Sequence, residues 1–367
     1  MTDKIKSKLR VLFSFLSYQL FYRFFYRRFE RDRDGKPLKK GITAVVVARD
    51  EENIIALALR SLIGFADQVV CIDNGSSDAT LTLMREFKER HEGEIEVDVL
   101  SMPDALLGDC RQKGLDLTRY SWHLRWDADM VFKTSGPEDC RLLRKRVLAD
   151  NRPRAVQLPR TNLFGDFHHT SRLYSPLDPG EPILIKYCTK ITYREFGKFD
   201  TVRLPVYYKS VKEKKHYYFH CDGLKSDMRL IYRNAYFDWR QHVNSAKGRD
   251  AEIDFESYRK DWLRKRYGTL DEQKLKYRYQ KELMRHIVRF DTGKYGEYPE
   301  IIREAMKAGN ERFKIIYRNG KAVARRDADD PSFENFRPGE DDLAFDPMTV
   351  FRSAIRDASV LKKLEED

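Results

Sequence analysis

The sequence predicts an α/β fold in which a mostly parallel sheet is flanked by helices. The first observation is a regular alternation of short apolar runs with amphipathic runs between residues 41 and 126. The second is that polar clusters follow three of the apolar runs. The third is a length of 367 residues with 41% hydrophobic side chains, which is enough to bury a full core. Together they indicate a folded protein with at least one α/β domain.

The elements of this domain follow one another along the chain. Runs rich in β-branched and aromatic residues predict strands at 41–49, 67–73, 94–102 and 121–126. Apolar residues at helical spacing predict helices at 50–66, 76–90 and 108–120. Because ligands bind outside the carboxyl ends of parallel strands, the polar clusters at 49–52, 73–78 and 127–129 are expected at one functional edge.

Two aspartates, Asp127 and Asp129, interrupt the apolar run WHLRWDADMVF at the end of the fourth strand. Carboxylates one residue apart can converge on a hard divalent cation and leave coordination positions for phosphate oxygens and water. Surface loops often contain such a pair, but this pair follows a buried strand and shares an edge with a second acidic turn. The pattern therefore predicts a metal site.

Four ordered segments, AVVVARDEENI, VVCIDNGSSDAT, CRQKGL and LRWDADMVF, resemble the signature of the inverting family 2 glycosyltransferases, which have the GT-A fold. The resemblance covers residues 41 to 133 and extends more weakly to about residue 245. No glycine-rich phosphate loop accompanies these strands, which argues against a kinase or a dinucleotide enzyme.

The resemblance implies a set of site residues. It assigns the metal, Mn²⁺ or Mg²⁺, to Asp127 and Asp129, with His220 completing the site. It assigns nucleotide binding to residues at the strand ends and on later elements, namely Arg49, Glu51, Asp73, Asp78, Arg111, Asp127, Lys225 and Arg229. For Asp78, a helix cap is an equal alternative.

Inversion requires a general base that takes the proton of the acceptor hydroxyl. Asp200 is the predicted base, because it lies where some relatives carry a His-Glu pair before the late histidine. This chain lacks that pair, and a simple turn role for Asp200 stays open. Other acids of the same stretch are Asp166, Asp178, Glu181 and Glu195.

The N-terminal 40 residues hold much of the net charge of +12. They contain 12 Lys and Arg against 4 acids, so 12 − 4 = +8. Residues 11–29 are aromatic and apolar but meet Arg23 too early to span a bilayer, for which about 20 apolar residues are needed. We therefore expect a helix lying on an anionic membrane surface, with a helix packed on the protein as the alternative. Five scattered cysteines without a C-x-x-C pair favour a reducing cytoplasmic location, here the inner face of the membrane.

The chain divides into three expected regions: a basic amphipathic segment at 1–40, the glycosyltransferase domain at 41–245 and a mostly helical region at 246–367. In the last region we expect helices at 253–268 and 271–290, a hairpin turning at Asn319-Gly320 and a final helix at 346–366. A polar loop at 327–342 separates the last two.

The predicted function is metal-dependent transfer of a sugar from a nucleotide-sugar to a hydroxyl of a lipid-linked or cell-envelope glycan. UDP is the nucleotide by resemblance, with GDP and dTDP open because Asn74 stands where the family often has Asp. A non-catalytic scaffold of the same fold is the alternative. Nucleic acid is disfavoured as a partner, since the charge lies beside an apolar segment and not on a binding module. A homo-oligomer is left open.

Overall fold

Seven strands form the largest sheet, in the order β13-β6-β10-β4-β1-β2-β3. In this computed structural model they are β1 (Lys39–Ala48), β2 (Gln68–Asp73), β3 (Glu96–Ser101), β4 (Tyr120–Asp127), β6 (Arg154–Gln157), β10 (Pro182–Lys186) and β13 (Lys209–Lys212). Strands β3, β2, β1 and β4 run parallel, and β10 runs antiparallel to both β4 and β6. The expected α/β class with a mostly parallel sheet is confirmed.

The structure describes residues 9, 12–13, 16, 31–103, 105–173, 177–178, 180–196, 199–245, 254–330, 335–354, 362 and 364. Most of the expected membrane-surface segment therefore lies outside the described residues. Leu9, Leu12, Phe13 and Leu16 are helical, and their side chains are 48 to 62% exposed. Among the helices that the structure describes, none is long and apolar enough to cross a bilayer.

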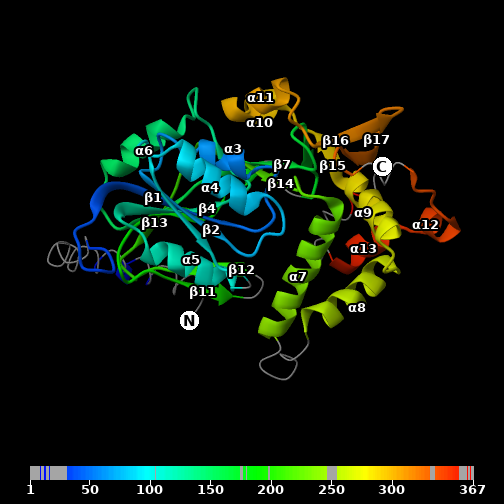
Figure 1. Ribbon diagram of the computed structural model, residues 1–367, viewed down its shortest axis with the longest axis horizontal. Coiled ribbons are helices and arrows are strands. Elements are labelled where there is room, and N and C mark those ends of the chain that lie inside the picture. The colour runs from blue at the N-terminus through cyan, green and yellow to red at the C-terminus, as the bar shows by residue number, and fades with distance from the viewer. Residues whose placement is uncertain are drawn as a thin grey trace.

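Helices cover both faces of the sheet because its strands are apolar on both sides. The helices are α3 (Ile55–Arg60), α4 (Thr80–Arg90), α5 (Leu107–Asp116) and α6 (Cys140–Leu148). Ala44 and Val46 of β1 share a core with α3, α4 and α6, whereas Val45 and Val47 pack with Cys110 of α5. Figure 1 shows α3 and α4 on one side of the sheet and α5 on the other.

A second sheet, in the order β5-β14-β7-β9, adjoins the end of β4. Its strands are β5 (Met130–Phe132), β14 (Tyr218–Asp222), β7 (Arg160–Phe164) and β9 (Leu177–Asp178). A turn of two residues, Ala128 and Asp129, connects β4 to β5. Because β14 pairs with β5, His220 lies opposite Met130, directly beyond that turn.

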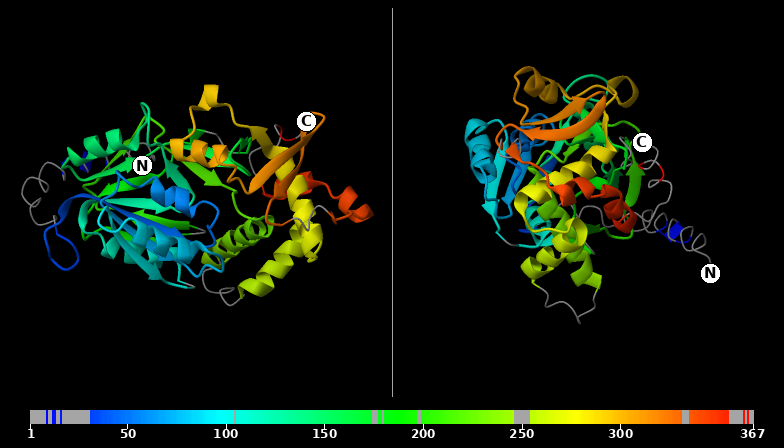
Figure 2. Two further views of the ribbon diagram at one scale, coloured as in Figure 1. Left: turned by 45° about the horizontal axis from the view of Figure 1, so that its top comes forward. Right: turned by 90° about the vertical axis from the view of Figure 1, so that its right-hand side faces the viewer.

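The C-terminal part of the chain is mostly helical and is gathered beyond one end of the large sheet (Figure 2). Its helices are α7 (Asp227–Ser245), α8 (Phe255–Tyr267), α9 (Glu272–His286), α10 (Thr292–Tyr295), α11 (Glu300–Lys307), α12 (Glu340–Ala344) and α13 (Pro347–Ala354). The hairpin β16 (Phe313–Arg318) and β17 (Lys321–Asp327) turns at Asn319 and Gly320, as predicted, and both residues have positive φ.

The C-terminal part shares its core with the preceding elements. Strand β15 (Ile287–Arg289) pairs with β8 (His169–Ser171), and Phe290 and Phe313 lie in one apolar cluster with Leu163 and Phe219. A further two-stranded sheet, β11 (Thr192–Phe196) with β12 (Phe199–Arg203), packs against α5.

Some predicted helix bounds are wrong for a local reason. The helix expected from residue 50 begins only at Ile55, because Asp50 has a positive φ of 54° and binds the next loop. Its carboxylate accepts the Ser77 N–H at 2.6 Å, and the Asp50 N–H donates to the Ser76 hydroxyl at 3.0 Å. Of the expected final helix, the structure describes α13 and residues 362 and 364.

Candidate active site

The carboxyl ends of β1, β2 and β4 lie level at one edge of the large sheet. Val47 of β1 pairs with Asp127 of β4, and Ala48 pairs with Asp73 of β2. Residues 49–52, 73–78 and 127–129 follow these ends, so the expected convergence of the three polar clusters on one edge is confirmed.

Asp129 and His220 lie side by side at this edge. The backbone holds them there, because Cys221 N–H donates to the Asp129 carbonyl at 2.8 Å. His220 Nε2 is 3.3 Å from Asp129 Oδ1. Burial opposes protonation of the imidazole, but the Asp129 carboxylate outweighs it and raises the pKa of His220. Burial likewise opposes ionisation of Asp129, yet His220 and Lys225 lower its pKa.

These two side chains fit a divalent cation. Asp129 Oδ1 is buried and accepts no hydrogen bond, and a carboxylate with an imidazole is a suitable donor set for Mn²⁺ or Mg²⁺. The described residues contain no group of three or more His, Cys, Asp and Glu side chains that could hold an ion alone. Such a pair would leave the remaining positions to phosphate oxygens and water, as Mg²⁺ sites commonly do.

Asp127, the other predicted metal ligand, is held by Arg111 of α5. The buried Arg111 guanidinium donates to Asp127 Oδ1 and also to the Trp126 carbonyl at 2.8 Å. Burial opposes ionisation of Asp127, while Arg111 and then Arg125 lower its pKa below the ordinary value. Arg111, predicted to contact the nucleotide, is therefore placed to orient Asp127, and the metal role of Asp127 stays a prediction.

Asp200, the predicted general base, lies near Arg111 and Arg125. Its side chain is 5% exposed, and Oδ2 is 4.0 Å from Arg111 Nε and 3.7 Å from Arg125 Nη1. The Asp200 carboxylate thus lies between two guanidinium groups. This environment favours a structural ion network, and the base role stays a prediction.

Two consecutive acids after β1, Asp50 and Glu51, meet cations from later in the chain. Glu51 Oε1 is 2.5 Å from Lys225 Nζ, which also lies 3.9 Å from Asp129 Oδ2. Asp50 Oδ2 is 2.8 Å from Arg229 Nη2. Burial raises the pKa of Glu51 to about 7, against the opposing effect of Lys225. The predicted residues Glu51 and Lys225 are thus brought together beside Asp129, and Arg229 pairs with Asp50 of the same loop.

Asp73 and Asp78 are turned into their own loop. Asp73 accepts the N–H groups of Gly75 and Ser76, at 3.1 and 3.2 Å. Asp78 accepts the N–H groups of Thr80, the first residue of α4, at 2.9 Å and of Glu52 at 3.2 Å. The N-cap of α4 is Ala79, so Asp78 lies one residue before the cap position.

Arg49 is a predicted nucleotide contact with an unused donor at this edge, as is Arg111 at its Nε. The Arg49 Nε is buried without a hydrogen-bond partner. Asn74 gives its side-chain amide to the carbonyls of Met102 and Ala105, at 2.8 and 2.9 Å. The Asn74 amide therefore shapes the loop, while Arg49 remains available to a ligand.

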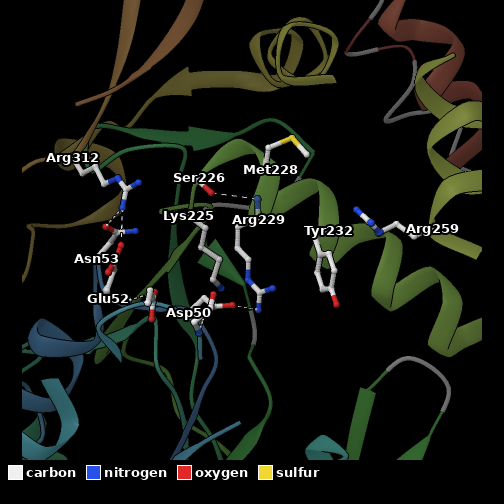
Figure 3. A pocket seen from close by; sticks show the side chains of 12 residues that line it. Asp50, Glu52, Asn53, Lys225, Ser226, Met228, Arg229, Tyr232, Arg259 and Arg312 are labelled. Carbon is white, nitrogen blue, oxygen red and sulfur yellow. Dashed lines mark hydrogen bonds and ion pairs between the residues drawn. The ribbon is translucent and has the colours of Figure 1, made fainter. Parts of the chain in front are cut away.

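A cleft of about 360 Å³ opens beside this cluster. Figure 3 shows Lys225 and Arg229 directed towards Asp50 on one side of it, and Arg312 near Glu52 and Asn53 on the other. The lining residues come from the loops after β1 and β2, from the segment between β14 and α7, from α7 and α8, and from the segment before β16: Asp50, Glu52, Asn53, Ser77, Asp78, Lys225, Ser226, Met228, Arg229, Tyr232, Arg259 and Arg312.

Sequence reasoning missed Tyr232, Arg259 and Arg312. Arg229 and Arg259 lie over the Tyr232 ring, 5.2 and 5.8 Å from its centroid. Arg312 Nη1 donates to Glu52 Oε1 at 3.1 Å and to Asn53 Oδ1 at 2.9 Å. No local motif marks Arg312, which lies 260 residues from Glu52.

Residues 43–174 match the model of the family described as glycosyl transferase family 2. The resemblance found in the sequence is thereby confirmed over these residues. A comparison with curated proteins gave no match.

Solved structures of glycosyltransferases are similar to the chain at low identity. S. aureus TarS 1-349 is 14% identical, with 78% of this chain and 100% of that chain covered and a TM-score of 0.34. The mannosyltransferase PcManGT from Pyrobaculum calidifontis, in complex with GDP-Man and Mn²⁺, is 14% identical, with 68% and 79% covered and a TM-score of 0.36. Glucosyl-3-phosphoglycerate synthase from Mycobacterium tuberculosis is 19% identical, with 34% and 44% covered and a TM-score of 0.24. These values assign no residue of the site.

Proposed function

We propose that this chain, whose residues 43–174 match the model of glycosyl transferase family 2, is a metal-dependent inverting enzyme. It would move a sugar from a nucleotide-sugar, with UDP as the first nucleotide to test, to a hydroxyl of a lipid-linked or cell-envelope glycan. The observation that carries the proposal is the convergence of Asp129, His220 and Lys225 at the edge where β1, β2 and β4 end.

Different residues of the chain would bind the cation and the diphosphate. Asp129 and His220 would hold the cation, which when bound neutralises charge on the departing diphosphate. Lys225 and Arg229 supply positive charge beside it, and each is at present balanced by an acid of the loop after β1. Arg111 fixes the orientation of Asp127 at the mouth of the site. Preorganised charges of this kind stabilise the transition state without further rearrangement.

The nucleotide requirement is the first test. Binding of UDP, GDP and dTDP to the purified chain would be measured by calorimetry, each with and without Mn²⁺. We expect one nucleotide to bind selectively and only with Mn²⁺. Nucleotide binding of equal strength with and without Mn²⁺ would contradict the proposed metal dependence. Absence of binding for all three nucleotides would favour the non-catalytic scaffold.

Slow hydrolysis of the nucleotide-sugar distinguishes an enzyme from the non-catalytic scaffold. A transferase releases sugar from its nucleotide-sugar even without acceptor, because water can replace the acceptor hydroxyl, whereas a scaffold releases none. Nucleotide release from the selected nucleotide-sugar over hours would therefore decide between the two.

The base is tested with Asp200→Asn. If Asp200 is the base, nucleotide binding is retained and transfer to the acceptor is lost. Retained transfer in this variant would move the base to another acid, and loss of both activities together with a lower melting temperature would assign Asp200 to the ion network with Arg111 and Arg125.

We also propose that the N-terminal segment binds the cytoplasmic face of an anionic membrane. Leu9, Leu12, Phe13 and Leu16 recur at helical spacing and are exposed, and residues 1 to 40 carry a net charge of 12 − 4 = +8. The full chain should sediment with vesicles containing phosphatidylserine and not with neutral vesicles. Phe13→Asp or removal of residues 1 to 33 should release it, and unchanged sedimentation of both variants would refute the proposal.

A further inference from the structure

A buried arginine of the C-terminal hairpin reaches the loop that carries Lys225. Arg325 lies on β17, and its side chain is 1% exposed. A guanidinium so far from water has to satisfy its charge and its donors inside the protein. Its partners therefore show which segment it stabilises.

All of the polar partners of the Arg325 guanidinium lie at residues 165 and 223–227. It donates to the carbonyls of Gly165 at 3.1 Å, Gly223 and Lys225, and it is 2.9 Å from Asp227 Oδ1. The segment 223–227 connects β14 to α7 and bears the ammonium group that stands between Glu51 and Asp129. One side chain thus binds the backbone on both sides of the Lys225 Cα as well as the start of α7.

Two further contacts fix Arg325 itself. Its guanidinium lies over the Phe313 ring, 4.2 Å from the centroid. Gln280 of α9 accepts the Arg325 N–H at 3.2 Å and gives its amide to the Arg325 carbonyl at 2.8 Å and to Asp227 Oδ2 at 2.7 Å. Helix α9, the hairpin and the first turn of α7 are therefore joined through one arginine.

The loop at residues 223–227 is closely packed at Gly223. Gly223 has a φ of 84°, and a Cβ at this position would lie 3.0 Å from Gly165 N. The carbonyls of Gly165 and Gly223 both accept hydrogen bonds from Arg325, so the guanidinium links these two backbone segments. A planar group with five donors suits this task, and an ammonium group does not.

We propose that Arg325 is a positioning residue for donor binding. It holds residues 223–227 so that Lys225 stands beside Asp129, where the diphosphate would bind. The proposal rests on the proposed function for the ligand, but its structural part, the ordering of the loop by Arg325, can be tested without any ligand.

The first experiment is hydrogen exchange on the full chain, comparing wild type, Arg325→Lys and Arg326→Met. Arg326 is the exposed neighbour on the same strand and serves as the control. We expect amides of residues 223–229 to lose at least about tenfold in protection in Arg325→Lys, while those of β1 and β4 keep theirs. Protection in residues 223–229 equal to that of wild type would overturn the proposal, and so would an equal loss throughout the chain.

The second experiment is a double-mutant cycle on nucleotide binding with Mn²⁺. Lys225→Met and Arg325→Lys should each weaken binding by about 10-fold or more, and the double variant should be no weaker than Lys225→Met alone. Additive losses would show that Arg325 does not act through Lys225. The lysine variant keeps the buried charge, so the test does not depend on the folding of Arg325→Met. If wild type binds no nucleotide, the proposed function fails, and hydrogen exchange alone decides the role of Arg325.

Discussion

The sheet edge and the C-terminal part of the chain contribute opposite charges to one cleft. The loops after β1 and β2 supply Asp50, Glu52 and Asp78, whereas α8 and the segment before β16 supply Arg259 and Arg312. The acids directly follow strands in the sequence, so their place at the sheet edge is determined locally. The cations arrive through tertiary packing, so the first half of the site depends on local structure and the second on the whole fold.

The largest effect is expected on the sheet side, from Asp129→Asn. The amide is nearly isosteric but uncharged, so we expect turnover to fall by about 100-fold or more, with loss of Mn²⁺-dependent nucleotide binding while the fold is retained. Asp109→Asn, on the exposed face of α5, is the control. Full turnover in Asp129→Asn would contradict the metal assignment.

On the C-terminal side, Asp342→Ala should reduce stability and leave the metal site chemically intact. Asp342 is fully buried, and its Oδ1 is 2.7 Å from Arg278 Nη2. Breaking a buried pair leaves one charge uncompensated, so unfolding in urea should require about 3 kcal/mol less free energy. The same change at exposed Asp341 should cost no more than about 0.5 kcal/mol. Equal losses at both positions would mean that the pair does not stabilise this part of the chain.

A third prediction concerns Glu51, where the two sides meet. Burial raises its pKa from the ordinary 4.5 to about 7, so between these values the folded state holds more protons than the unfolded state. The stability of wild type should therefore fall as pH rises from 5 to 7, by up to about 1.4 kcal/mol per pH unit.

Glu51→Gln removes this titrating group and should flatten the dependence. Urea unfolding at pH 5, 6 and 7 would measure it, with the exposed Glu92→Gln as control. A pH dependence in Glu51→Gln as steep as in wild type would assign the effect to other groups.

The smallest effect is expected from Arg312→Ala at the rim of the cleft. Arg312 contacts Glu52 and Asn53 but is partly exposed, so we expect nucleotide binding to weaken by about two- to tenfold. Arg318→Ala, exposed at the hairpin turn, should change binding by less than twofold, or roughly 0.4 kcal/mol. Equal effects of the two variants on nucleotide binding would show that Arg312 does not contribute to the donor site.

The sequence was sufficient to predict the elements that local chemistry determines. Apolar runs located β1, β2, β3 and β4, and the change from apolar to acidic residues located Asp127 and Asp129 at a strand end. His220 could be placed near them only through the family resemblance, because the pairing of β14 with β5 joins residues 90 positions apart.

What escaped prediction depends on long-range contacts. Asp73 and Asp78 are predicted to bind the nucleotide, with a helix cap as the alternative for Asp78, and the sequence did not indicate that their oxygens accept backbone N–H groups of their own and the neighbouring loop; the nucleotide role stays a prediction. Arg325 looks like one cation of an exposed, alternating hairpin, yet it is buried against Phe313. Successive side chains of a strand point to opposite faces. Tertiary packing determines which of the two faces is buried, so the alternation alone does not predict that Arg325 is buried.

The shared apolar cluster limits how the chain can be shortened. Phe290, Ile302 and Phe313 pack with Val131 and Phe219, although the family match ends at residue 174. A fragment that stops at residue 174 or 245 would leave the cluster open to solvent and β8 without its partner strand. Because Asp342 is the partner of Arg278 and α13 packs against α9, expression trials and crystallisation fragments should keep the polypeptide through α13, and the region recognisable by sequence is smaller than the smallest unit expected to be soluble.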